Sequence, residues 1–212
     1  MDTSAKLVAF HAFGSCSLAT LVALEDTELP YRGVAIDLKG DRTDFRVTNP
    51  GGRMPALLDD GELLTETPAI LYRLAGKVPE LRLFPNKARD IARMLSMLCW
   101  FSSGVHIPRR SFRAPNHFSA DPVVQADISG HARPAVHANL CLIDALLIGQ
   151  KWLFGAEFSF ADAYALVFCS WARVDGFDLS EFQRLDSWRL AMLERPAVRR
   201  ALAIDCNTAV AA

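Results

Sequence analysis

The sequence lacks the features that define several common classes of protein. It contains no block of lysine and arginine, and its formal net charge is −1 over 212 residues. A nucleic-acid-binding surface needs concentrated positive charge to neutralise phosphates. The richest apolar window, LCLIDALLIG, is interrupted by Asp144 and is too short to span a bilayer. The sequence therefore indicates neither a nucleic-acid partner nor a membrane partner.

Paired cysteines are also lacking. The five cysteines are widely scattered and show neither a CxxC pair nor a Cys/His metal spacing, which argues against a disulfide framework and a bound metal. They are Cys16, Cys99, Cys141, Cys169 and Cys206. The first ten residues lack the basic segment and long apolar run of a secretory signal. We therefore expect a globular protein of a reducing compartment, the cytoplasm, without a metal.

The chain that remains divides into two unlike halves. In residues 1–78, short runs typical of strands alternate with helical patterns in the order βαβαββα, which fits a small mixed sheet with helices on its faces. A linker is expected at residues 79–85. Residues 86–212 show helical patterns only. The expected fold is an α/β domain followed by an all-helical domain.

Turn and capping residues predict where several elements begin and end. Asp60 and Gly61, between two apolar runs, predict a hairpin, and the following helix is expected to end at Gly76. Asp121 and Pro122 predict the start of a long helix. Pro134 lies inside that helix and should kink or split it.

The segment FSFADAY, residues 158–164, carries a folding signal. Ser159 and Asp162 stand three residues apart, which is the spacing of a helix capping box. We assign this segment no chemistry from its residues.

The segment GSCSLA, residues 14–19, follows a strand pattern and opens a helical one. A helix N-terminus carries unpaired amides and a partial positive charge, so it favours an anion. A thiolate held there is stabilised, whether it belongs to Cys16 or to a bound thiol. The alternative is that Ser15 or Ser17 only caps the helix and Cys16 is a small buried residue.

The segment GRMPALL, residues 52–58, contains a proline where the first strand of the hairpin should begin. Sheets tolerate Pro55 at that position as an ordinary first residue of a strand. Alternatively, a cis peptide between Met54 and Pro55 would present the main-chain N–H and C=O of Met54 to an extended peptide ligand.

The segment TETPAI, residues 65–70, predicts a helix start with Thr67 as N-cap and Pro68 as first helical residue. The Thr67 hydroxyl and nearby amides could also hold a carboxylate, and Glu66 could receive an ammonium group. Together they match the α-amino-acid end of a γ-glutamyl group. Helix capping alone is the alternative.

NPGGRMPALL, DGELLTET and FSFADAY, in this order and at these separations, resemble the cytosolic glutathione transferase family. The cysteine at the start of the first helix resembles that of the bacterial beta class. The resemblance covers nearly the whole chain. It implies a thioredoxin-like domain that binds glutathione as co-substrate, and a helical domain with a pocket for a small hydrophobic electrophile. It also implies a homodimer and a role in detoxification.

By this resemblance, Cys16 corresponds to the active-site cysteine and His106 to an active-site histidine. Ser15 and Ser17 are reserve candidates for the donor to the thiolate. The expected chemistry is attack of the stabilised glutathione thiolate on an electrophilic carbon. Alternatively, Cys16 forms a mixed disulfide with glutathione, which gives thiol-exchange chemistry.

The resemblance also assigns the binding residues. Met54 and Pro55 look like the loop that pairs with the cysteinyl part of glutathione. Glu66 and Thr67 look like the clamp for its γ-glutamyl end.

The chain departs from the family pattern in three places. Ile107 follows the histidine where the family usually has lysine, and Cys99 stands where the beta class tends to have asparagine. A lysine for the glycyl carboxylate is missing as well. Lys39, Arg42 and Arg53 are the candidates to replace it.

HIPRRSFR, residues 106–113, is the most individual stretch of the sequence. On a helix, His106 would share a face with Arg109 or Arg110, although Pro108 makes a continuous helix doubtful. The stretch is either a solvated basic surface or part of the second-substrate pocket, where an arginine would favour a carboxylated or phenolate-bearing electrophile.

Aromatic residues could form the apolar wall of that pocket. Phe13 is expected there, and Trp100, Phe101, Phe112 and Phe118 are further candidates. Aromatics at helical spacing are more often core residues, which is the alternative for this group.

Two other functions stay open. One is a non-catalytic protein of this fold that binds glutathione and acts as a regulatory partner. The other keeps an enzyme but changes its reaction to glutathione-dependent thiol exchange, ether cleavage, dehalogenation or isomerisation.

Overall fold

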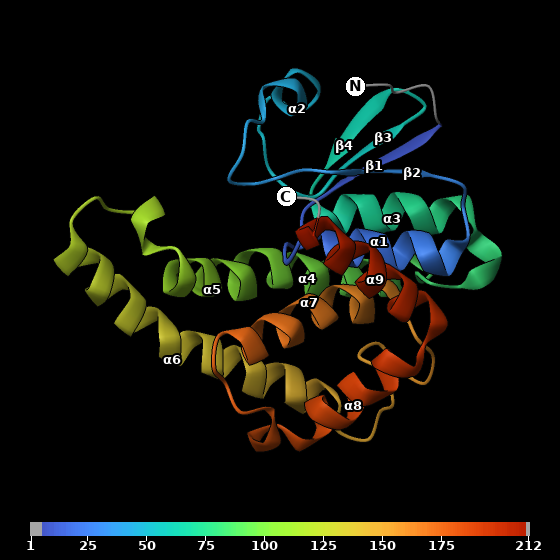
Figure 1. The fold of residues 1–212 in the computed structure, drawn as a ribbon. Helices are drawn as coiled ribbons and strands as arrows, with labels where there is room; N and C mark the ends of the chain where they lie inside the picture. Colours follow the sequence, from blue (N-terminus) through green and yellow to red (C-terminus); the bar gives the residue numbers. More distant parts are fainter. Residues whose placement is uncertain (1–5, 211–212) are drawn as a thin grey trace.

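The computed structural model describes residues 6–210, and their side chains up to residue 206. The first part of the chain forms a four-stranded mixed sheet with helices, in the predicted order βαβαββα (Figure 1). Its elements are β1 (Leu7–His11), α1 (Ser17–Thr27), β2 (Arg32–Ala35), α2 (Thr43–Thr48), β3 (Ala56–Asp59), β4 (Glu62–Thr65) and α3 (Thr67–Lys77). The prediction of a thioredoxin-like α/β domain is confirmed.

The sheet has the strand order β2-β1-β3-β4, in which only β1 and β2 are parallel. Successive side chains of a strand point to opposite faces. In β1, Leu7 and Ala9 accordingly join one hydrophobic cluster, whereas Val8 and Phe10 join a second cluster with Phe45 of α2. The sheet is therefore covered on one face by α1 and α3 and on the other by α2 (Figure 1).

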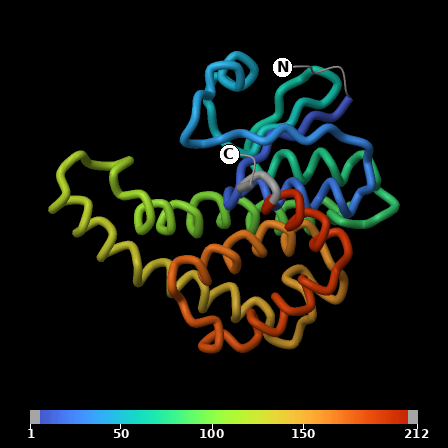
Figure 2. Tube along the Cα trace, in the orientation of Figure 1, coloured from blue at the N-terminus to red at the C-terminus, as the bar shows by residue number. Residues whose placement is uncertain are grey.

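The second part of the chain is helical, as predicted. It comprises the α-helices α4 (Ala88–Trp100), α5 (His106–Arg113), α6 (Pro122–Leu146), α7 (Phe160–Val174), α8 (Gln183–Glu194) and α9 (Pro196–Val210). Short helical turns occur at η1 (Pro79–Leu81), η3 (Pro115–His117) and η4 (Leu179–Glu181), and η2 (Phe101–Val105) is π-helical. The tube in Figure 2 shows these helices gathered on one side of α1 and the sheet.

Several predicted boundaries need correction. Gly76 does not end α3, which continues to Lys77. Pro134 does not split α6, which runs unbroken from Pro122 to Leu146. Pro108 does not interrupt α5. It lies in the first turn of that helix, which directly follows the π-helical turn η2, and the carbonyl of Gly104, four residues earlier, accepts instead from Asn139 Nδ2 at 2.8 Å.

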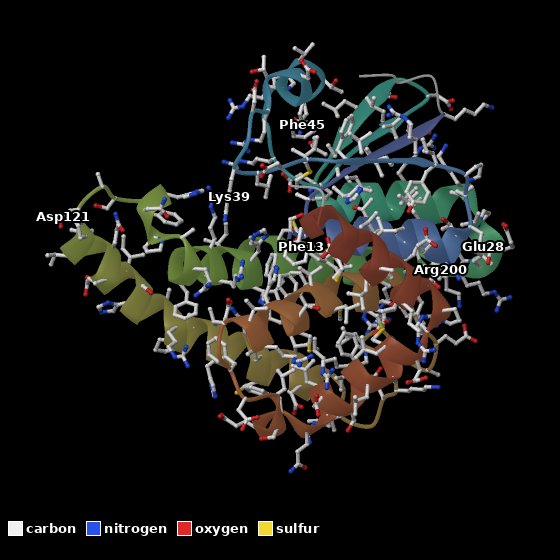
Figure 3. The ribbon with its side chains drawn as sticks, in the orientation of Figure 1. Phe13, Glu28, Lys39, Phe45, Asp121 and Arg200 are labelled. Atoms are coloured by element: carbon white, nitrogen blue, oxygen red, sulfur yellow. The ribbon has the colours of Figure 1, made fainter. Side chains whose placement is uncertain are left out.

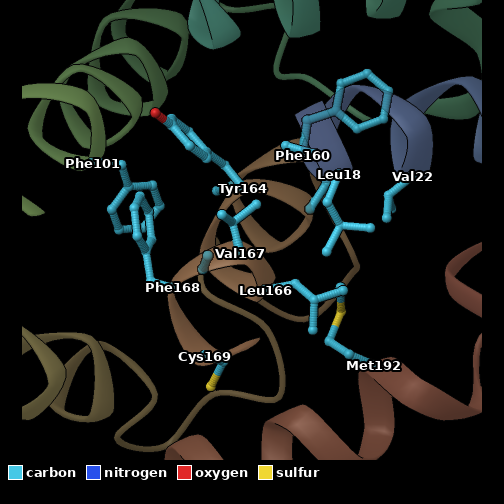
Figure 4. Close-up of a cluster of buried hydrophobic side chains, with 14 of the residues drawn as sticks. Leu18, Val22, Phe101, Phe160, Tyr164, Leu166, Val167, Phe168, Cys169 and Met192 are labelled. Atoms are coloured by element: carbon cyan, nitrogen blue, oxygen red, sulfur yellow. The ribbon is translucent and has the colours of Figure 1, made fainter. Parts of the chain in front are cut away.

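One hydrophobic core joins the two parts. Leu18 and Val22 of α1 lie beside Phe160 and Tyr164 of α7 and Met192 of α8 (Figure 4). Helix α9 also packs along α1. The first helix is thus held between the sheet and the helical domain, which fixes the loop in front of it.

The predicted capping box at Ser159 and Asp162 is confirmed, and Asp162 does more than cap. Its fully buried carboxylate accepts hydrogen bonds from Ser159 N (2.9 Å), Ser159 Oγ (3.0 Å), Leu153 N (2.9 Å) and Trp188 Nε1 (2.9 Å). Burial raises the pKa of Asp162, and the four donors oppose that rise. Asp162 therefore ties the start of α7 to the preceding loop and to α8.

Candidate functional site

The loop between β1 and α1 is fixed by two serines. Ser17 Oγ lies 3.1 Å from Ala12 N and 3.3 Å from Ala12 O, and Ser15 Oγ lies 2.7 Å from Ser17 Oγ. Ser15 Oγ also accepts from Ser17 N at 3.2 Å. The two serines named as reserve thiolate donors are therefore engaged in holding the loop.

Gly14 is the part of this loop that the helical domain holds. Its φ of +65° is a conformation that glycine adopts without steric cost. Its N–H donates to Asp205 Oδ2 of α9 (3.2 Å), and its carbonyl accepts from Trp171 Nε1 of α7 (2.8 Å). Both polar groups of Gly14 are thus paired with residues far along the chain.

Cys16 stands at the N-cap of α1 and is 6% exposed. Its Sγ donates to the carbonyl oxygen of Met54 at 3.3 Å. Burial raises the pKa of the Cys16 thiol to about 11; Glu66 raises it further, whereas the Cys16 amide and the Thr67 hydroxyl act in the opposite direction. In the free protein, desolvation therefore outweighs the effect of the helix start on the Cys16 thiol.

The loop before β3 reaches this thiol. The peptide between Met54 and Pro55 is cis, which is the form that would present the main chain of Met54 to a ligand. Met54 itself is half-buried and Pro55 is buried at the start of β3. Since the Met54 carbonyl already contacts Cys16, the two segments predicted to meet glutathione lie against each other.

The start of α3 differs from the prediction by one residue. Helix α3 begins at Thr67, so the N-cap is Glu66, whose φ of 69° lies in a region that favours glycine. Thr67 is buried, with its hydroxyl close enough to Cys16 to affect that thiol, and Glu66 is exposed. The start of α3, with the buried Thr67 hydroxyl, therefore lies next to the Cys16 thiol, and the exposed Glu66 carboxylate lies beside it.

Tyr164 of α7 lies beside these residues, a proximity that the sequence did not reveal. Burial raises the pKa of Tyr164, and the charges of Cys16 and Glu66 act in the same direction, whereas hydrogen bonds from Ser102 and Thr67 oppose it. Its hydroxyl lies 3.2 Å from Ser102 Oγ and points out of the hydrophobic cluster in Figure 4. The π-helical turn η2 carries Ser102, and such turns often mark functional sites.

His106 opens α5 and is half-buried against the indole of Trp171, with ring centroids 4.9 Å apart. Burial lowers the pKa of His106 to about 4, and Arg109 and Arg110 lower it further. His106 is therefore a neutral imidazole at pH 7. It lies one side chain away from the Gly14 loop, because Trp171 contacts both.

Arg109 and Arg110 both have protein partners. Arg109 pairs with Asp175 through two hydrogen bonds (2.8 and 3.1 Å) and lies 4.3 Å from the centre of the Trp171 ring. Arg110 Nη2 lies 2.7 Å from Nδ1 of His117. The basic segment of residues 106–113 is thus neither a simply solvated surface nor a set of free cations.

The candidates for the glycyl carboxylate lie in the loops beside α2. Lys39 is exposed in the loop after β2 (Figure 3). Arg42 donates to Gly52 O at 3.4 Å, and Arg53 is exposed directly before Met54. Of the three, Arg53 is adjacent in sequence to the Met54 loop.

The aromatic candidates separate into two groups. Phe13 is 55% exposed beside Gly14, and Phe118 is 51% exposed beyond α5. Phe101 is fully buried in the core, and Trp100 and Phe112 are partly buried against it. Only Phe13 combines exposure with a place in the loop before Cys16 (Figure 3).

The structure shows no metal centre in the part of the chain that it describes. Among residues 6–210, no group of three or more His, Cys, Asp or Glu side chains is arranged to hold a metal ion. No helix in that range has the length and apolar character needed to cross a bilayer.

Comparisons with known proteins agree with this geometry. Residues 5–76 match the family model of the glutathione S-transferase N-terminal domain, and residues 125–196 match that of the C-terminal domain. The glutathione S-transferase GstA of Escherichia coli O157:H7 is 30% identical over 206 residues, which cover 92% of this chain and 97% of the relative.

Two solved structures share the whole fold. A glutathione transferase homologue from Sulfitobacter with bound glutathione has a TM-score of 0.85 and 26% identity, covering 93% of this chain and 97% of its own. The bacterial beta class glutathione S-transferase of Sphingomonas chungbukensis has a TM-score of 0.82 and 32% identity, covering 93% and 98%.

Proposed function

From the premise that this chain belongs to the glutathione S-transferase family, we propose that it binds glutathione next to Cys16 and directs the bound thiolate at a small hydrophobic electrophile. The observation that carries this proposal is the convergence of the Cys16 thiol, the Met54 carbonyl and the Thr67 hydroxyl at the start of two helices. These groups suit the sulfur, the main chain and the γ-glutamyl carboxylate of glutathione, respectively.

In this proposal Cys16 acts as a hydrogen-bond donor to the glutathione sulfur. A thiol with a pKa of about 11 remains protonated at pH 7. It donates to Met54 O in the free protein, and rotation of its side chain would aim the same proton at a bound thiolate. Hydrogen bonds to a charged acceptor are stronger than neutral ones, so such a donor favours ionisation of glutathione.

The exposed side chains near the Cys16 loop and at the start of α5 suggest the charge and polarity of the electrophile. Phe13 and Ile107 are 55% and 46% exposed, and His106 is neutral at pH 7. Arg109 and Arg110 are held by Asp175 and His117, so they favour an anionic electrophile less than the sequence suggested. We therefore propose an uncharged, apolar electrophile.

A binding titration tests the glutathione site. Calorimetry with glutathione is expected to show binding by the wild type. Thr67→Ala should weaken it roughly tenfold, because the ligand carboxylate loses a hydroxyl donor. Thr43→Ala is the matched control, since Thr43 also begins a helix but pairs only with Asp41 in its own loop. Wild-type protein that gives no heat of binding would overturn the proposal.

A turnover panel separates the enzyme from the alternatives. Wild type and Cys16→Ala are assayed with glutathione and a series of electrophiles, and with a glutathione mixed disulfide. Conjugation that drops in Cys16→Ala supports the donor role. Glutathione binding without any turnover supports the non-catalytic binder, and loss of disulfide exchange alone supports the thiol-exchange enzyme.

The assembly and the location are part of the same proposal. The family relationship supports a homodimer, and β4 is an unpaired edge of the sheet, with Tyr72 of the adjacent α3 49% exposed. Light scattering on the purified protein tests the dimer. A cytoplasmic location and a role in detoxification are tested by fractionation and by the electrophile sensitivity of cells lacking the protein.

A further inference from the structure

A cysteine, a histidine and a carboxylate lie in line on the outer side of the helical domain. Cys141 Sγ is 3.7 Å from Nδ1 of His137, one turn earlier on α6. The other ring nitrogen, Nε2, is 3.2 Å from Glu181 Oε2 of η4. Helix α6 lies beyond α7 from the sheet and from the Cys16 loop (Figure 1). This cluster is therefore separate from the proposed glutathione site.

The contact with Glu181 favours one tautomer of the His137 ring. An ionised Glu181 carboxylate only accepts hydrogen bonds, so Nε2 must donate to it. In the neutral imidazole, Nδ1 then has a free lone pair. That lone pair faces the Cys141 sulfur, which is the arrangement in which a histidine takes a proton from a thiol.

His137 is held in this orientation by its neighbours. Its ring centroid lies 5.2 Å from that of Phe182 and 6.5 Å from that of Phe177, both buried residues of the segment beside η4. A base oriented by a third group, with a nucleophile within reach, is the general pattern of an activated side chain. Cys141 itself is exposed, so a soluble reagent has access to it.

Cys206 is also exposed, and the three remaining cysteines differ from Cys141 in exposure or in surroundings. Cys16 and Cys169 are buried, and burial raises the pKa of Cys16 to about 11 and that of Cys169 to about 12. Cys99 is exposed on α4, where its carbonyl accepts from Ser103 Oγ. Cys99 therefore serves as an internal reference for an exposed thiol.

We propose that Cys141 is a second reactive thiol, activated by His137 and Glu181, that forms a mixed disulfide with glutathione disulfide. His137 Nδ1 takes the thiol proton, and the Cys141 sulfur attacks one sulfur of the reagent. The new protein–glutathione S–S bond replaces the reagent's S–S bond. One glutathione thiolate leaves and can be protonated by the imidazolium. Glutathione disulfide is the oxidant. It releases one glutathione thiol, while the Cys141 thiol is oxidised to the mixed disulfide.

The experiment measures modification at each cysteine of the intact protein. The protein is incubated with glutathione disulfide at pH 7, and mass spectrometry of its peptides gives the rate at Cys141 and at Cys99. Cys141 is expected to react at least about tenfold faster, because His137 Nδ1 lies within reach to take its proton as the sulfur attacks. His137→Gln should bring the two rates within about twofold, and Glu181→Gln should slow Cys141 to an intermediate rate.

His131→Gln is the matched control. His131 is another exposed histidine of α6, and its partner is Asp127 of the same helix. This variant should leave the Cys141 rate unchanged. Cys141→Ser should leave glutathione conjugation unchanged, which keeps this test independent of the proposed function. Equal wild-type rates at Cys141 and Cys99 would overturn the proposal, as would an unchanged Cys141 rate in a folded His137→Gln variant. If the His137→Gln variant does not fold, the ratio of the Cys141 rate to the Cys99 rate in the wild type decides whether Cys141 is activated.

Discussion

The thiol of Cys16 donates a hydrogen bond to the carbonyl oxygen of Met54 across 3.3 Å, and so joins the first helix to the loop before β3. The Cys16 side chain is buried, and that burial determines the protonation of the sulfur. Burial raises the pKa of Cys16 to about 11. The consequences for reactivity can be measured directly.

Cys16 of the free protein should resist alkylation at neutral pH. Iodoacetamide reacts with thiolates, and only a minute fraction of Cys16 is ionised below about pH 9. We expect peptide mapping to show Cys99 alkylated first at pH 7, and Cys16 only near pH 11 or after unfolding in urea. Alkylation of Cys16 and Cys99 at similar rates at pH 7 would show that the thiol ionises in the fold.

Burial of His106 should destabilise the fold in acid and leave it unaffected by ionisation at neutral pH. Burial lowers its pKa to about 4, whereas in the unfolded chain it titrates near 6.5. The unfolded state therefore binds more protons between these values, so the free energy of unfolding rises with pH over this window, by at most roughly 3 kcal/mol. Urea unfolding of wild type and His106→Gln from pH 4 to 7 measures the difference. Parallel curves for the two proteins would contradict the lowered pKa.

Asp162 should be among the residues most important for stability. Asp162→Ala leaves four donors without their acceptor in a fully buried position, and each such loss costs about 1 kcal/mol or more, so we expect a total of at least about 3 kcal/mol. Urea denaturation measures it.

Asp121→Ala provides the comparison for that loss. Asp121 also caps a helix, but it is exposed and its side chain accepts from Val123 N alone. We expect a cost of about 1 kcal/mol. Equal losses in the two variants would mean that the buried network around Asp162 adds nothing beyond an ordinary cap.

The sequence predicted the elements of this fold well because their signals are local. Asp60 and Gly61 do form the turn between β3 and β4, and Ser159 with Asp162 does cap α7. The start of α3 was displaced by one residue, since Glu66 rather than Thr67 takes the non-helical position. Helix α6 runs unbroken through Pro134, so that proline does not split it.

The site was predicted only where a motif marked it. Cys16, Met54 and Thr67 come together as their segments suggested, but the protonation of Cys16 depends on burial, which no local pattern shows. Trp171 and Asp205 could not be found, because they reach Gly14 from 157 and 191 residues away. Tyr164 stood inside a recognised capping motif, yet its contact with Ser102 depends on how α7 packs.

Arg109 and Arg110 of α5 test whether that helix contributes to stability or to substrate selection. Asp175 has a side chain with no exposed surface, and Arg109 supplies two of its hydrogen bonds while Arg113 pairs with it at 3.1 Å. Arg109→Ala should therefore lower the free energy of unfolding by roughly 2–4 kcal/mol, because a buried carboxylate loses most of its compensation.

Arg110→Ala is the matched change on the same helix. Arg110 contacts the exposed ring of His117, so its removal should alter the free energy of unfolding by less than about 0.5 kcal/mol. Because Arg109 also stacks on Trp171, which holds Gly14, Arg109→Ala is expected to raise the KM for glutathione and the electrophile together. A selective loss for anionic electrophiles in either variant, with stability unchanged, would instead assign that arginine to the second-substrate pocket.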